Sequence, residues 1–147
     1  MSIKDVQEAK NSLLKYFAIM FVLCTLLQII IAIRGNRIDV VSQLLLGAVA
    51  LYYVYYNYSS RNLLIRLRFG RLVSHLIGFL VVNVSFHLHA FILFDSNNSA
   101  INGDGNFAID PSWFGVLFGM LTFWGIGLLA HLGASIAKRG FEELPKD

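Results

Sequence analysis

The chain has 147 residues, of which 56% are hydrophobic and 14% are charged. Soluble domains carry about 25% charged residues, so this composition excludes an ordinary soluble globular domain. The net charge of +3 is sorted between loops, as described below, and does not indicate a nucleic-acid partner.

Four long segments contain no Asp, Glu, Lys or Arg, namely residues 16–33, 40–60, 72–94 and 111–137. A helix needs about 20 apolar residues to cross a bilayer, and the outer faces of a soluble bundle would carry charges. We therefore predict an all-α, integral membrane bundle of four transmembrane helices that forms a single membrane domain over residues 1–147. The helices are expected at about 13–33, 40–58, 72–94 and 112–137.

The first helix is preceded by a mixed-charge stretch that should continue it toward the N-terminus. No small-residue cleavage site follows the helix, only Arg34-Gly35-Asn36-Arg37, so a cleaved signal peptide is not expected. The single cysteine, Cys24, lies mid-helix and is expected to pack as a small hydrophobe. One cysteine excludes an intrachain disulfide and a multi-cysteine metal site.

The second helix ends in "LYYVYYNY", residues 51–58, which contains five tyrosines. Tyrosine is enriched where helices meet the membrane interface, so an aromatic belt is the favoured interpretation, with a ligand site as the alternative. The basic residues then fix the orientation. If the N-terminus is cytoplasmic, ten of the twelve Lys and Arg residues lie inside, and only Arg34 and Arg37 lie outside. This positive-inside bias predicts that both termini are cytoplasmic and that residues 61–71 follow the inner surface.

The third and fourth helices carry intramembrane histidines. His75 and His89 are fourteen residues apart, about 21 Å along a helix, so they belong to opposite leaflets. His131 in the fourth helix lies at nearly the same depth as His75. Such residues usually face the bundle interior. They could form a hydrogen-bonded structural pair, ligate a tetrapyrrole such as haem b or a chlorophyll-type pigment, or serve a metal or proton relay. Two histidines make a poor metal cage, so no metal site is predicted.

Glycines and further polar residues accompany these histidines. Gly78 and Gly127 lie about one turn from His75 and His131 and would leave room for a flat ligand or another helix. "GVLFG", from Gly115 to Gly119, offers a small-xxx-small packing face.

The other polar residues of the third helix are also expected to face inward. We expect Asn83 to bond to a neighbouring helix. His87 and His89 are expected to face an outer polar layer with Gln28 and Gln43, which lie at similar depth.

The last two helices resemble the bacterial two-transmembrane (2TM) domain family over about residues 69–143. The matching residues are His75, Phe79, Val82-Asn83 and "FWGIGLLAH", residues 123–131, followed by the charged tail "KRGFEELPKD", residues 138–147. His89 stands where that family tends to have a second asparagine. The family occurs alone or fused to histidine kinases and response-regulator modules. The resemblance implies a helical hairpin in the bacterial inner membrane and assigns no chemistry to its polar residues.

The functional hypotheses follow from what the sequence contains. No nucleophile–base pair, glycine-rich phosphate loop or carboxylate pair suggests an enzyme, so no catalytic residue is predicted. The first hypothesis is a small multi-pass protein without catalytic activity, acting as an accessory subunit or sensor module through contacts with other membrane subunits or a second copy. The alternative is a bis-histidine tetrapyrrole protein in an electron-transfer or photosynthetic assembly. A transporter or channel is a third hypothesis, without a membrane-embedded charge to favour it.

Overall fold

The computed structural model describes residues 3–103 and 108–137, and within these residues all regular structure is helical. Three spans are single helices, α1 (Ile3–Ile33), α2 (Val40–Ser59) and α4 (Gly70–Asp95). The last span consists of α5 (Pro111–Phe114), a π-helical turn η1 (Gly115–Gly119) and α6 (Met120–Ala137). All four are long and apolar enough to cross a membrane, which confirms the predicted all-α membrane bundle.

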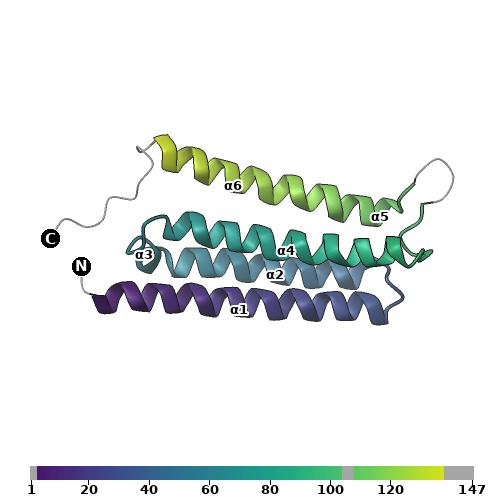
Figure 1. The fold of residues 1–147 in the computed structure, drawn as a ribbon, viewed down its shortest axis with the longest axis horizontal. Coiled ribbons are helices and arrows are strands. Elements are labelled where there is room, and N and C mark those ends of the chain that lie inside the picture. Colours follow the sequence, from purple (N-terminus) through teal and green to yellow (C-terminus); the bar gives the residue numbers. More distant parts are fainter. Residues whose placement is uncertain (1–2, 104–107, 138–147) are drawn as a thin grey trace.

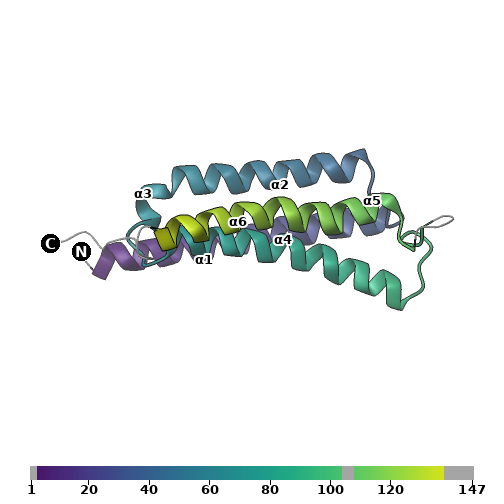
Figure 2. The ribbon, with the colours of Figure 1, turned by 90° about the horizontal axis from the view of Figure 1, so that it is seen from above.

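The four spans run side by side along one axis, and α4 lies between α1 and the last span (Figure 1). α4 packs against α1, α2 and the last span, and α1 also packs against α2. α2 lies at one edge of the bundle (Figure 2). The beginning of α1 and the end of α6 lie at the same end of the bundle, which we call the α3 end, as an even number of crossings requires (Figure 1). The opposite end is called the α5 end.

Helical periodicity explains which residues form the core. The buried residues of α1 recur every three or four positions and make one stripe, formed by Tyr16, Met20, Cys24, Leu27 and Ile31. Large apolar side chains elsewhere on the spans are exposed, including Phe21, Leu51, Val84 and Leu129. In water such a surface would be unstable, whereas lipid chains solvate it, so the chain is an integral membrane protein.

A short turn at the α5 end connects α1 to α2. Gly35 and Asn36 have positive φ angles of 81° and 60°. The backbone N–H of Asn36 donates to the carbonyl of Ile31 at 2.9 Å, so α1 ends in a left-handed turn. Asp39 caps α2 by accepting a 2.9 Å hydrogen bond from the Ser42 backbone N–H, and it also accepts from Arg34. The Ser42 N–H and then Arg34 lower the pKa of Asp39 to about 2.

The α3 end is tied together by ion pairs outside the apolar part of the bundle. α1 has 31 residues, about 46 Å at 1.5 Å per residue, so it exceeds the hydrocarbon thickness of about 30 Å. Arg66 follows the short helix α3 (Arg61–Leu64) and bonds to Asp5 at 3.2 Å and to Glu8 at 3.5 Å. The segment expected along the inner surface therefore folds as a short helix and turns against the protruding part of α1.

Some residues behind the predicted orientation lie outside the described residues. These are the basic residues Lys138, Arg139 and Lys146, and with them the charged tail that contributed to the 2TM resemblance. The side of the membrane that each end faces stays a prediction.

Candidate functional site: two polar clusters and two grooves

One polar cluster combines residues from three spans near the α3 end, and we call Tyr53, His75 and His131 the tyrosine–histidine cluster. The Tyr53 hydroxyl and His75 Nδ1 share a hydrogen bond. The rings of His75 and His131 stack with centroids 3.7 Å apart and an angle of 16° between their planes. The structure thus brings together the two histidines that the sequence placed at one depth. They meet as a stacked pair, and the hydroxyl partner of His75 comes from α2.

Gly78 is the residue that lets α2 approach α4 beside this cluster. A Cβ at position 78 would lie 2.7 Å from Cδ2 of Tyr53 and 2.9 Å from the hydroxyl of Tyr16. Glycine is needed here because any side chain would collide with the ring of Tyr53 and the hydroxyl of Tyr16. The space that the sequence suggested for a flat ligand or another helix is therefore filled by the protein's own tyrosines. Gly127 differs, because a Cβ there would meet nothing within 4 Å.

The tyrosine–histidine cluster does not fit a tetrapyrrole ligated by both histidines. Bis-histidine ligation places the two imidazoles on opposite faces of the macrocycle, with the metal between them. Here the rings lie face to face at 3.7 Å, the thickness of direct stacking, so nothing can lie between them.

The tyrosines of α2 divide between the interior and the surface. Tyr56 is buried, stacks on Tyr16 with centroids 4.0 Å apart, and its hydroxyl lies 3.0 Å from Ser12 Oγ. Tyr55 and Tyr58 are exposed, as an aromatic belt requires. The belt interpretation was therefore wrong for Tyr53 and Tyr56, which belong to the packing between helices.

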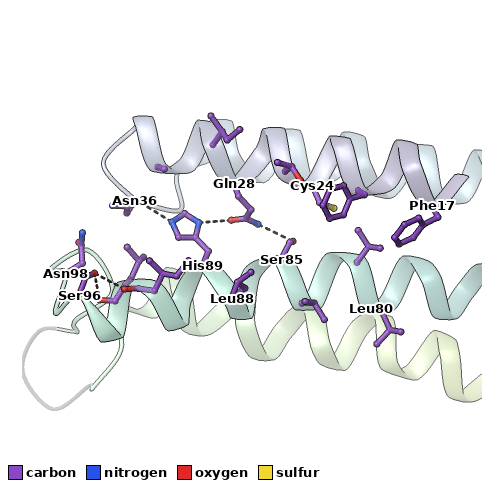
Figure 3. Close-up of a pocket in the computed structure, with 18 residues that line it drawn as sticks. Phe17, Cys24, Gln28, Asn36, Leu80, Ser85, Leu88, His89, Ser96 and Asn98 are labelled. Atoms are coloured by element: carbon purple, nitrogen blue, oxygen red, sulfur yellow. Dashed lines mark hydrogen bonds between the residues drawn. The ribbon is translucent and has the colours of Figure 1, made fainter. Parts of the chain in front are cut away.

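The second polar cluster lies near the α5 end and comprises Gln28, Asn36, Ser85 and His89, which we call the Gln28–His89 cluster (Figure 3). His89 Nδ1 lies 2.8 Å from Oε1 of Gln28, and Nε2 lies 3.0 Å from Oδ1 of Asn36. Gln28 also donates to Ser85 at 3.3 Å. The Asn36 carbonyl accepts a 2.9 Å bond from the indole of Trp113. The predicted contact of His89 with Gln28 is thus observed.

Three expected polar contacts are not formed. Asn83 was expected to bond to a neighbouring helix, but it donates to the carbonyl of Phe79 in its own helix at 2.8 Å. His87 is exposed and bonds to the carbonyl of Asn83. Gln43 is exposed on α2 and does not join the layer. Asn83 does face inward and is buried, but its amide bonds within α4, whereas His87 and Gln43 lie on exposed faces of α4 and α2 that point away from the Gln28–His89 cluster.

The glycines of "GVLFG" do not pack against another span of this chain. Gly115 and Gly119 delimit the π-helical turn η1, and a Cβ at either position would meet nothing within 4 Å. If these glycines pack against a helix, that helix must therefore belong to another molecule.

Two grooves accompany the clusters. The α2–α6 groove has a volume of about 490 Å³ and is lined by Gly47, Ala50, Leu51, Tyr53, Val54, Phe123, Trp124, Ile126 and Gly127. The α1–α4 groove has a volume of about 820 Å³ and includes the Gln28–His89 cluster in its lining. Among the described residues, no group of three or more His, Cys, Asp or Glu side chains could hold a metal ion.

Comparison with protein-family models, curated proteins and solved structures finds no match to this chain. The class of protein is therefore defined by the fold alone, as a four-helix integral membrane protein.

Proposed function

We propose that this protein is a non-catalytic interaction subunit of a membrane complex, which binds a transmembrane helix of another subunit in the α2–α6 groove. The observation that carries the proposal is the open junction between α2 and α6. The two helices meet through Tyr53 and Trp124, whose ring centroids are 4.5 Å apart, and separate beside this contact to leave the groove.

The groove has the properties of a helix-binding surface. Gly47 and Gly127 lie on opposite walls, and the space beside both is empty to at least 4 Å. Small residues allow the backbones of two membrane helices to approach closely, which is what stabilises such contacts where the hydrophobic effect does not act. The walls beside them, such as Leu51, Val54 and Ile126, are exposed and apolar. An incoming helix could therefore pack ridges against a surface without charged groups.

The location within the cell is part of the proposal. The distribution of basic residues and the resemblance of residues 69–143 to the bacterial 2TM domain family support the bacterial inner membrane, with both termini cytoplasmic. The occurrence of that family beside histidine kinases supports a role in a sensor or accessory assembly. The tetrapyrrole alternative is not retained, because the stacked histidines leave no space for the ring.

The test is the size of the complex extracted from native membranes in polymer nanodiscs. We expect the wild-type chain to migrate as a complex larger than the single chain. Gly47→Leu and Gly127→Leu should each reduce it to the single chain, because leucine occupies the groove while its Cβ meets no atom of the fold within 4 Å. Gly133→Leu is the matched control, since Gly133 is an open glycine of α6 that does not line the groove.

Mass spectrometry of the complex then identifies the bound helix as a second copy or a different subunit. A wild-type chain that is already single, or a complex that survives both groove variants, would overturn the proposal.

A further inference from the structure

Basic side chains mark the level at which the apolar spans meet the α3 end. Three of them stand directly beside a charge-free segment, namely Lys15 before residues 16–33, Arg61 after residues 40–60 and Arg71 before residues 72–94. A charge-free segment of this length fills the hydrocarbon layer, so the residue that borders it lies where the phospholipid headgroups begin. Long basic side chains extend into that layer and keep their charges out of the hydrocarbon. We call these three residues the α3-end basic patch.

The fold brings the patch together from α1, α3 and α4. Gly70 lies directly against the carbonyl of Leu64, so the beginning of α4 packs on the end of α3. The guanidinium carbon of Arg61 lies 4.7 Å from the centroid of the Tyr58 ring, a cation–π contact that orients this side chain. The patch is therefore carried by packed helices.

The patch carries charge that the fold does not balance. All three of its residues are exposed, and none of them pairs with a carboxylate among the described residues. Asp5 and Glu8, the described carboxylates of this end, bind Arg66 instead. Residues 40–94 contain no Asp or Glu, so α2, α3 and the beginning of α4 cannot supply a counter-charge. The anions that balance the patch must come from its surroundings.

The position and the residue types of the patch select the anion. A guanidinium donates two parallel hydrogen bonds to a phosphate, and its charge persists at any physiological pH. At the boundary of the hydrocarbon, the phosphates are those of phospholipids. A zwitterionic headgroup brings its own cation and leaves the patch unbalanced, whereas an anionic headgroup such as that of phosphatidylglycerol neutralises it. Each Lys or Arg near the membrane surface strengthens binding to anionic lipid by about fivefold.

We propose that the α3-end basic patch binds the phosphates of anionic phospholipids and selects these lipids from those that surround the bundle. Arg61 and Arg71 donate to phosphate oxygens, and Lys15 adds a positive charge on the α1 side. The patch shares no residue with the α2–α6 groove, so this lipid selection does not depend on the proposed helix docking.

The experiment is native mass spectrometry of the purified full-length protein, titrated with phosphatidylglycerol or with phosphatidylcholine of the same acyl chains. We expect the dissociation constant of the first bound phosphatidylglycerol to be lower by about fivefold or more. Glycerol 3-phosphate at the same concentration as the lipid should not displace it, because this soluble anion lacks the acyl chains that contact the apolar spans.

Three variants connect the selectivity to the patch. Arg61→Gln and Arg71→Gln should each raise the dissociation constant of phosphatidylglycerol by about fivefold. Their affinity for phosphatidylcholine should stay the same, which separates a lost charge from a damaged fold. Arg37→Gln removes an exposed arginine from the α5 end and is the matched control, so it should leave the selectivity unchanged.

Equal affinities of the wild type for the two lipids would overturn the proposal, and so would an unchanged selectivity in both patch variants. The same loss in Arg37→Gln as in Arg61→Gln would show a general effect of net charge and also overturn it. Displacement of the lipid by glycerol 3-phosphate would indicate a site for soluble phosphates in place of a lipid site.

Discussion

Replacing Gly78 by alanine should destabilise the bundle, although alanine is the better helix former. The substituted Cβ would lie 2.7 and 2.8 Å from Cδ2 and Cε2 of Tyr53 and 2.9 Å from the Tyr16 hydroxyl. Neither ring is free to move away. Tyr53 is held by His75 and by its contact with Trp124, and Tyr16 is stacked on Tyr56.

The magnitude follows from two opposing effects. Alanine in place of glycine within a helix stabilises it by about 0.5–1 kcal/mol. Overpacking of a filled core costs about 1–3 kcal/mol. Gly127→Ala experiences the first effect only, because the added methyl group meets nothing within 4 Å. The free energies of unfolding of the two variants should therefore differ by about 1–3 kcal/mol, with Gly78→Ala the less stable.

The assay is reversible unfolding in bicelles, measured for the wild type, both glycine variants, Tyr53→Leu and the double variant Gly78→Ala with Tyr53→Leu. If the collision with Tyr53 causes the loss, the cost of Gly78→Ala should shrink in the Tyr53→Leu background. Equal stability of the Gly78→Ala and Gly127→Ala proteins would refute the reasoning, and so would full additivity in the double variant.

Three further predictions test the tyrosine–histidine cluster, the topology and the cap of α2. Tyr53→Phe should lower the free energy of unfolding by about 1–3 kcal/mol, because half-buried His75 loses its hydroxyl partner, and thermal unfolding in detergent would measure this. In a cysteine-free background, a cysteine at position 98 should react with an impermeant thiol reagent added outside intact cells, whereas one at position 60 should not; the reverse pattern would contradict the orientation. Asp39 has a pKa lowered to about 2 by the Ser42 N–H and Arg34, so its contribution to stability is fully present above its unfolded value of about 3.9 and is lost as pH falls through about 2. The same loss should occur at neutral pH in Asp39→Ala, and a protein whose midpoint of thermal unfolding is unchanged by that substitution would exclude the cap.

The spans and the shared depth of two histidines could be predicted because both depend on helix length alone. The limits of the charge-free segments set the approximate ends of the transmembrane helices. A rise of 1.5 Å per residue places His75 and His131 at nearly the same depth in the membrane. The expected ends at Val40 and near Phe94 differ from the observed ends by no more than one residue.

The failures concern rotation about the helix axis and contacts across loops. The exposure of His87 depends on how α4 is turned against its neighbours, which the sequence of one helix does not determine. Asn36 was missed because it reaches His89 only after the turn at Gly35 folds back. The inward direction of some α2 tyrosines, in contrast, could have been predicted from the sequence. Five tyrosines within seven positions, at 100° per residue, must cover both faces of the helix, so some of them had to point inward.

The overhang of α1 has a consequence for its attachment to the bundle. Arg66 pairs with both Asp5 and Glu8, so the first turns of the chain are linked to the connection between α2 and α4 outside the hydrocarbon. All three side chains are partly exposed to water, and salt screens ion pairs of this kind. The attachment of the N-terminal turns should therefore weaken as ionic strength rises, while the apolar packing of the spans does not.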